Sequence, residues 1–285
     1  MNQNVLITGA SRGLGAAMVK AFWKTGANLV LVARNEKALN TLISTLEPRQ
    51  GQSAYPLGCD LSAPGAVKTI IQKARGQFEH LDVLINNAAI QGPIGPSWEN
   101  DWEDWRQALD VDLFASIDLS RRCAAWMIPQ RKGKIICLSG GGAASSRPNF
   151  SAYAVAKAGL VRFCEVLADE LRVHNIQVNC IAPGAMATVL LDEIIKTGPE
   201  RAGQKEYESA MKIQEQNGGA LPDRAAQLAV FLASAASDGV TGKLISAVWD
   251  PWESLPDYVE DLQNTDIYTL RRIVPKDRGK SWGGS

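Results

Sequence analysis

The chain has 285 residues, 46% of them hydrophobic, and its 30 Lys and Arg side chains balance 30 Asp and Glu side chains. This length and composition allow a full core and predict one large α/β domain. Without a basic excess or a long run of like charge, neither a nucleic acid nor a membrane surface is expected as a partner.

Cysteine usage and the N-terminal pattern predict the compartment. The five cysteines are odd in number and have no Cys-x-x-Cys spacing, so they fit reduced thiols and predict neither a disulfide framework nor a metal site. The N-terminus lacks a signal-peptide pattern, and no apolar run reaches membrane-spanning length. We therefore expect a cytoplasmic protein.

The first motif is a glycine-rich turn between a strand and a helix. The apolar run Val5–Ile7 leads into Thr8–Gly15 (TGASRGLG), after which Leu14, Met18 and Phe22 recur at helical spacing. Glycines let a tight backbone approach a pyrophosphate, whose charge the amides at a helix N-terminus can bind. The position of the turn therefore predicts a nucleotide site.

The second strand, Asn28–Ala33, ends where sites for an unphosphorylated ribose usually carry an acidic side chain. Here Ala33 holds that place, followed by Arg34, while Arg12 lies in the glycine turn. Two guanidinium groups could bind a ribose 2′-phosphate, so the pattern favours NADP(H) over NAD(H). The alternative is that both arginines face solvent.

Further apolar runs alternate with helical segments along the chain. We expect strands at residues 54–61, 81–85, 134–138, 177–181 and 243–248. This alternation implies right-handed crossovers and a parallel sheet, whose ligands bind at the carboxyl ends of the strands.

Tyr153 and Lys157 lie four residues apart in a helix predicted over residues 151–172. They therefore share one helix face, and a neighbouring ammonium favours the phenolate. The pair predicts a proton donor that works near neutral pH.

Two later segments lack a strand pattern. Residues 189–219 are amphipathic, charged and bounded by glycine, which predicts a mobile lid over the ligand cleft. Residues 249–285 contain prolines and a glycine-rich end, and we expect an extended C-terminal arm with a disordered tip. The main domain is expected over residues 1–248.

Taken together, the motifs resemble those of the short-chain dehydrogenase/reductase family over roughly residues 4 to 248. They are Thr8–Gly15, Asp60–Leu61, Asn86–Ala88, Tyr153 with Lys157, and Pro183–Thr188. The resemblance implies a single-domain Rossmann fold with a seven-stranded parallel sheet and helices on both faces. It also implies hydride transfer between a nicotinamide cofactor and a carbonyl or alcohol carbon, and a homodimer or homotetramer.

The resemblance also implies roles for individual residues. Tyr153 would be the general acid for ketone reduction, and Lys157 would lower its pKa and contact the nicotinamide ribose. The implied cofactor-binding residues are Gly9, Ser11, Arg12, Gly13, Leu14, Gly15, Arg34, Asp60, Leu61, Asn87, Ala88, Tyr153, Lys157, Pro183, Gly184 and Thr188.

Two positions depart from the family pattern. Ser139 stands 14 residues before Tyr153, one more than usual, and Gly140 occupies the usual serine place. We favour Ser139 as the donor to the substrate oxygen; the alternatives are Ser145, Ser146 or a site without a hydroxyl. Asp112 replaces the usual asparagine of a water relay to Lys157, and its charge would hold that lysine protonated.

Three functions remain open from the sequence. The leading hypothesis is an NADP(H)-dependent oxidoreductase acting on a small polar or carbohydrate-like substrate. A 3-oxoacyl thioester (acyl-carrier-protein) reductase is the second, because the glycine turn and the tyrosine helix closely resemble those of such members. The third is a non-catalytic NADP(H)-binding sensor or assembly subunit, suggested by the displaced serine and by Asp112.

Overall fold

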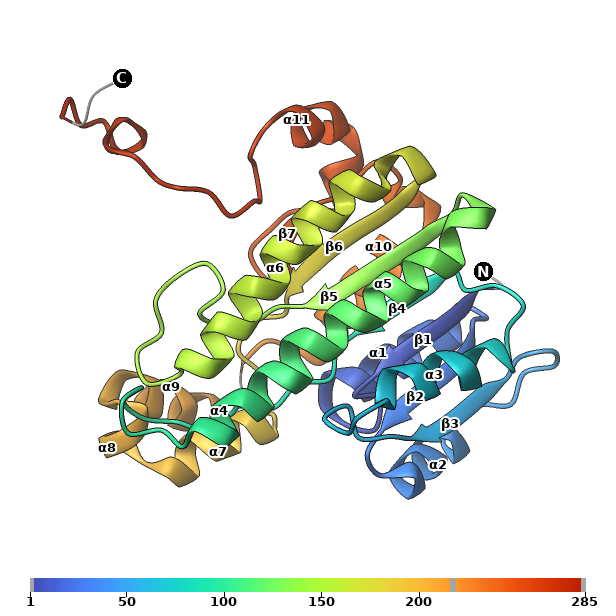
Figure 1. Ribbon diagram of the computed structural model, residues 1–285, viewed down its shortest axis with the longest axis horizontal. Coiled ribbons are helices and arrows are strands. Elements are labelled where there is room, and N and C mark those ends of the chain that lie inside the picture. Colours follow the sequence, from blue (N-terminus) through green and yellow to red (C-terminus); the bar gives the residue numbers. More distant parts are fainter. Residues whose placement is uncertain (1–2, 216–218, 283–285) are drawn as a thin grey trace.

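The structure, a computed structural model, describes residues 3–215 and 219–282 and is built on one sheet of seven parallel strands (Figure 1). The strands lie in the order β3-β2-β1-β4-β5-β6-β7. They are β1 Asn4–Thr8, β2 Asn28–Ala33, β3 Ala54–Gly58, β4 Val83–Asn86, β5 Gly133–Leu138, β6 Ile176–Ala182 and β7 Leu244–Ser246. The predicted seven-stranded parallel sheet is confirmed, although several strands begin or end one to three residues from their expected bounds.

Helices cover both faces of the sheet because successive strand residues point to opposite sides. Val5 and Ile7 of β1 belong to one buried cluster, whereas Leu6 belongs to the other. The first cluster includes α1 (Gly13–Lys24), α2 (Glu36–Ser44) and α10 (Pro222–Ala233). The second includes α3 (Ala66–Arg75), α5 (Ala115–Met127) and α6 (Ser151–Leu171).

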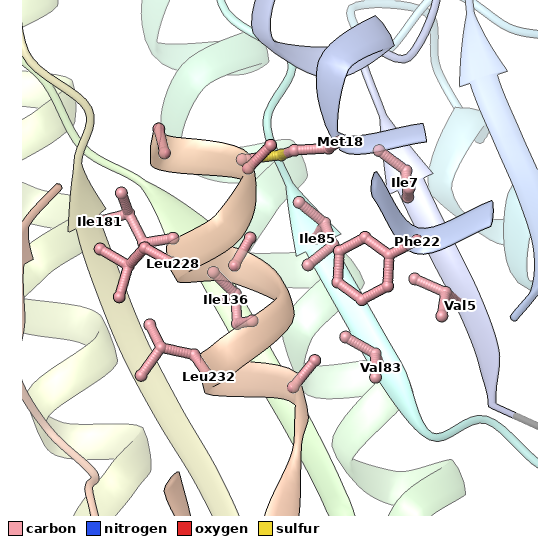
Figure 2. Packing of buried hydrophobic residues seen from close by; sticks show 14 of the residues in the cluster. Val5, Ile7, Met18, Phe22, Val83, Ile85, Ile136, Ile181, Leu228 and Leu232 are labelled. Atoms are coloured by element: carbon pink, nitrogen blue, oxygen red, sulfur yellow. The ribbon is translucent and has the colours of Figure 1, made fainter. Parts of the chain in front are cut away.

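Figure 2 shows how two helices fill the first cluster. Met18 and Phe22 of α1 lie over β1 and β4, and Leu228 and Leu232 of α10 lie beside them over the middle of the sheet. Phe22 is fully buried. This packing holds α1 against the sheet, and the helix begins at Gly13, within the glycine-rich stretch that follows β1.

The helix over the other face is interrupted near the site. Helix α4 (Trp102–Leu109) passes through a π-helical turn, Asp110–Phe114, into α5. Single π-helical turns inside helices occur often at functional positions. Short 3-10 turns lie at Ile128–Gln130, Arg172–His174, Ala235–Ser237 and Pro275–Arg278.

The segment predicted as a lid forms three helices at the carboxyl ends of the strands (Figure 1): α7 (Val189–Thr197), α8 (Pro199–Ala202) and α9 (Gln204–Glu215). We call these three helices the cover. Residues 216–218 of the predicted lid lie outside the described residues. The cover shares a small buried cluster with two neighbouring loops: Ile94, Phe150, Leu191, Ile194, Ala202 and Ala210.

The C-terminal arm is partly helical rather than extended. A 3-10 helix, Trp252–Tyr258, leads into α11, Val259–Asn264, because Trp252, Leu255 and Leu262 bury their side chains in the α10 cluster. The arm then reaches the sheet edge, where the backbone N–H of Leu244 in β7 donates to Tyr268 O at 2.8 Å. The described end projects from the body (Figure 1), and the predicted disordered tip includes residues 283–285, outside the described part.

Within residues 3–215 and 219–282, none of the helices is both long and apolar enough to cross a membrane.

Candidate active site

The predicted site residues gather at the carboxyl edge of the sheet, because all seven strands run in the same direction. Each group follows a different strand. In chain order after β1 to β6, they are Gly9–Gly15, Arg34, Asp60 and Leu61, Asn87 and Ala88, Ser139, and Pro183–Thr188. The sheet thus brings together motifs that lie far apart in the sequence.

The glycine turn is closed against the backbone around it. A Cβ on Gly15 would lie 2.1 Å from Gly9 O, and a Cβ on Gly9, whose φ is +63°, would lie 2.8 Å from the Cα of Ala88. Arg12 precedes α1 without a side-chain cap, and the first turn of the helix carries no acidic residue. The first N–H groups of α1 can therefore bind an anion, and the cradle fits a pyrophosphate.

Hydrogen bonds tie the ends of β1 and β4 together beneath this turn. Thr8 Oγ1 accepts from the backbone N–H groups of Asn87 and Ala88, at 3.0 and 3.1 Å. Asn87 Nδ2 in turn donates to Thr8 O and Gly9 O, at 3.0 and 3.1 Å. The cradle is therefore held in place by the protein's own contacts.

The region beyond the ends of β2 and β3 carries both positive and negative side chains. Hydrogen bonds from the backbone and side chain of Ser62 lower the pKa of Asp60, and Arg34 adds to this effect. Glu193 of α7 lies near the two predicted phosphate-binding arginines: burial raises its pKa, and Arg12 and Arg34 oppose that shift. A helix of the cover thus shares this region with both arginines.

Tyr153 and Lys157 lie buried on one face of α6. Lys157 Nζ is 5.5 Å from the centroid of the Tyr153 ring and donates to Leu138 O at 3.1 Å. Asp112, in the π-helical turn, places Oδ2 at 3.6 Å from Lys157 Nζ, while its Oδ1 accepts from the N–H of Ile90 at 2.8 Å. The ammonium is therefore held between a carbonyl and a carboxylate.

Burial and charge set the titration of these three groups. Burial raises the pKa of Asp112 to about 6, although Lys157 and the N–H of Ile90 oppose the shift. Burial raises the pKa of Tyr153 as well, and Lys157 again opposes it. Burial would lower the pKa of Lys157, but the charges of Asp112 and Tyr153 outweigh it and the pKa is raised. Lys157 therefore stays cationic.

The three candidate serines, Ser139, Ser145 and Ser146, all lie between β5 and α6. Ser139 is buried, and its Oγ has no hydrogen-bond partner among the described residues. A Cβ on Gly140 would lie 2.2 Å from Tyr153 Oη, so the tyrosine hydroxyl takes up the space that a side chain at this position would need. Ser145 and Ser146 are exposed. Of the three candidate serines, Ser139 therefore has the only buried hydroxyl, directly after the end of β5.

The loop after β6 reaches the glycine turn from the other side. Gly184 has a φ of +85°, and a Cβ there would lie 2.8 Å from both Ala220 and Val248. Thr188 precedes α7, and its Cγ2 would lie 3.8 Å from a Cβ on Gly13. The start of the cover therefore faces the predicted cofactor cradle.

Two arginines, one beside Tyr153 and one on the cover, carry no sequence motif. Arg147, in the loop between β5 and α6, forms an ion pair with Glu206 of α9 at 2.9 Å. Arg201 of α8 donates to Ile94 O at 3.1 Å. The position of Arg147, six residues before Tyr153, could have marked it as a site residue in the sequence. Its partner Glu206 lies 59 residues further on, and no sequence pattern links the two. Among the described residues no cluster of side chains is arranged to hold a metal ion.

Comparisons with known proteins agree with this arrangement. A family model described as short chain dehydrogenase matches residues 3–198. The 3-oxoacyl-[acyl-carrier-protein] reductase FabG of Thermotoga maritima is 30% identical over 240 residues, covering 84% of this chain and 94% of the relative.

Solved structures show the same fold. YwfH, an NADPH dependent reductase involved in bacilysin biosynthesis, is 27% identical with a TM-score of 0.77, covering 87% of this chain and 97% of its own. NAD+-bound xylitol dehydrogenase is 23% identical with a TM-score of 0.75, covering 86% and 96%. The chain therefore belongs to the short-chain dehydrogenases, oxidoreductases that act on alcohol and carbonyl groups with a nicotinamide cofactor.

Proposed function

We propose that the chain is an NADP(H)-dependent oxidoreductase that interconverts a ketone and an alcohol on a small polar or carbohydrate-like substrate. One observation carries this proposal: Tyr153 lies buried beside Lys157, whose Nζ is 5.5 Å from the phenol ring. The glycine turn after β1, followed by the uncapped N–H groups of α1, lies at the same carboxyl edge of the sheet and is proposed to bind the pyrophosphate. Proton donor and cofactor site thus border the same edge of the sheet.

Each residue of the site has a proposed role in reduction. When bound, the cofactor supplies a hydride to the carbonyl carbon. Tyr153 gives its proton to the carbonyl oxygen, and the ammonium of Lys157 stabilises the phenolate that remains. Ser139, whose hydroxyl has no other described partner, donates to the same oxygen as it gains negative charge. Asp112 orients Lys157 and keeps it protonated.

We further propose the cofactor contacts inferred from the motifs. Residues 9–15 would bind the pyrophosphate, and Asp60 with Leu61 the adenine edge. Asn87 and Ala88 would lie along the ribose, and Pro183–Thr188 along the nicotinamide. Arg12 and Arg34 would bind the 2′-phosphate, which a carboxylate at the end of β2 would otherwise repel.

Fluorescence titration with NADPH and NADH tests the cofactor proposal, using the eight tryptophans as probe. We expect tighter NADPH binding, and Arg34→Asp should shift the preference towards NADH. An unchanged ratio of the two dissociation constants in Arg34→Asp would show that Arg34 does not select the cofactor.

A 3-oxoacyl thioester reductase is the second candidate, favoured by the name of the Thermotoga maritima relative. Steady-state assays with NADPH and either acetoacetyl-coenzyme A or small hydroxyketones separate the two. A kcat/KM at least tenfold higher for the thioester would favour the second candidate. Tight NADPH binding without turnover of either would favour the non-catalytic sensor or assembly subunit.

For the domain organisation, we propose residues 1–248 as the catalytic domain, residues 189–219 as its substrate lid and residues 249–285 as a C-terminal extension. All five cysteines are free thiols, which fits a cytoplasmic location. Phe114 and Val155, on adjacent segments, are 54% and 48% exposed. Such apolar exposure supports a homodimer or homotetramer.

A further inference from the structure

Arg147 is a charged side chain fixed at the edge of the active site. Its side chain is only 15% exposed, and its guanidinium carbon lies 3.9 Å from the centroid of the Phe150 ring. Phe150 is fully buried and belongs to the cluster shared with the cover. A guanidinium stacked on an immobile ring keeps its orientation, so Arg147 is already positioned before any ligand arrives.

The guanidinium faces the proton donor. Its carbon lies 5.9 Å from the centroid of the Tyr153 ring, and its charge acts to lower the pKa of that tyrosine, against the effect of burial. The loop of Gly141 and Gly142 packs against Arg147, since a Cβ on Gly141 would lie 3.6 Å from Arg147 Cδ and one on Gly142 would lie 3.3 Å from Arg147 Cβ. A substrate held at Tyr153 would therefore have a cation beside it.

The present partner of Arg147 is a single carboxylate oxygen from the cover. Arg147 Nε and Nη2 both donate to Glu206 Oε2, at 3.2 and 2.9 Å. In the described part of the chain the other three N–H groups of the guanidinium have no hydrogen-bond partner. Glu206 is 33% exposed and lies on α9. Its oxygen can leave with the cover or by a change of rotamer, without disturbing the sheet.

We propose that Arg147 binds a carboxylate group of the substrate, and that Glu206 occupies this place when no substrate is present. The proposal rests on the proposed carbonyl chemistry and narrows its substrates to oxo acids and hydroxy acids. A guanidinium matches a carboxylate through two parallel N–H···O bonds, whereas Glu206 uses one oxygen only. The substrate acid therefore gains a contact that Glu206 does not make.

The test compares acids with their neutral esters. Purified full-length protein is assayed with NADPH on pyruvate, acetoacetate and levulinate and on their methyl esters, which differ in the spacing between carbonyl and carboxylate. We expect the best acid to exceed its ester in kcat/KM by roughly 10- to 100-fold, the range for a hydrogen bond to a charged group. Arg147→Gln should abolish this preference, mainly through the KM of the acid, and Arg147→Lys should retain part of it.

Two further variants separate binding from a structural role. Glu206→Gln removes the competing carboxylate charge and should lower the KM of the acid severalfold while leaving that of the ester unchanged. Arg201→Gln, which breaks another contact of the cover but leaves the guanidinium of Arg147 in place, should retain the preference for the acid. If Arg147→Gln weakens acid and ester equally, or Glu206→Gln does not favour the acid, the proposal is wrong.

Calorimetric binding of the same acids to the NADPH complex tests the carboxylate site separately from the proposed reaction. Acid binding that Arg147→Gln abolishes, without turnover of any acid or ester, would leave the carboxylate site standing and overturn the proposed reaction. Turnover of the esters without binding or preference for any of the acids would overturn the carboxylate site and leave the proposed reaction intact.

Discussion

The glycine turn, proposed to bind the cofactor, and the cover, proposed to close over the substrate, are held in place in different ways. On the cofactor side, Gly9 and Gly15 are packed against backbone, and Thr8 and Asn87 tie two central strands with hydrogen bonds of 3.0 to 3.1 Å. On the substrate side, the cover rests on a small cluster of six described residues and on ion pairs made by side chains. The glycine turn is therefore tied to the sheet, whereas the cover can separate from it.

This difference fits the two tasks of the site. A cradle that binds pyrophosphate through backbone N–H groups gains from being rigid, because no ordering cost is paid on binding. A cover that acts as the proposed lid would have to admit a substrate and release a product, so its contacts would have to be weak enough to break. Five substitutions test how the glycine turn, the buried groups around Tyr153 and the cover each contribute.

Tyr153→Phe should slow the reaction without weakening cofactor binding. Loss of the general acid should lower kcat by roughly 10²- to 10⁴-fold, while the dissociation constant of NADPH changes little. Steady-state kinetics and fluorescence titration of the same preparation measure the two quantities. Near-normal turnover in this variant would show that Tyr153 is not the proton donor.

Gly15→Ala should destabilise the glycine turn. The added Cβ would meet Gly9 O at 2.1 Å, and a backbone atom in a packed turn cannot move away as a flexible side chain can. We expect a loss of about 3 kcal/mol in the free energy of unfolding, at the upper end for overpacked positions. Urea denaturation measures it, and stability equal to the parent chain would mean that the turn is softer than the contacts indicate.

Asp112 should give stability a pH dependence. Its pKa is raised from 3.8 to about 6, so the unfolded chain releases this proton first as the pH rises. This contribution therefore lowers stability between about pH 4 and pH 6, by up to about 3 kcal/mol, and is constant above that window. Asp112→Asn should remove this contribution to the pH dependence of stability.

Urea denaturation across this pH window measures the effect, with Asp110→Asn as the matched control in the same π-helical turn. A pH slope in Asp112→Asn as steep as that of the parent chain would contradict the buried ionisation. A flattened slope in Asp110→Asn would show that the assignment to Asp112 is wrong.

Gly140→Ala should disturb the proton donor without disturbing the cradle. Its Cβ would lie 2.2 Å from Tyr153 Oη, whereas a Cβ on Gly141 would make only an ordinary contact, at 3.6 Å from Arg147. We expect a fall in kcat of about tenfold or more for Gly140→Ala, equivalent to about 1.4 kcal/mol in the barrier. Gly141→Ala should be close to the parent, and equal effects of the two substitutions would rule out the steric explanation.

Arg201→Gln should loosen the cover alone. Arg201 donates to Ile94 O and lies 3.6 Å from Glu99 in a pair whose side chains are about half exposed. Exposed pairs of this kind contribute less than about 1 kcal/mol, so global unfolding should change little. Hydrogen exchange in α7 to α9 should accelerate severalfold, while the glycine turn stays protected. Faster exchange in the turn as well would mean that the two halves open together.

The sequence alone determined the sheet and the placement of the motifs of the proposed site, because both depend on local patterns. Apolar runs predicted the strands, and glycines at the end of β1 predicted a tight turn before a helix. Tyr153 and Lys157 share a helix face by their spacing. The carboxyl ends of parallel strands lie at the same edge of a sheet. The direction of the strands therefore predicted that the motifs at these ends lie together.

Only the tertiary structure decided which side chains meet across long stretches of chain. Arg147 and Glu206 are 59 residues apart, and neither lies in a motif. The contact of Gly140 with Tyr153 Oη depends on how the loop after β5 bends, and the arm covers β7 because Tyr268 accepts from Leu244. Periodicity reports which face of an element is buried, whereas these contacts depend on the packing of separate elements against one another.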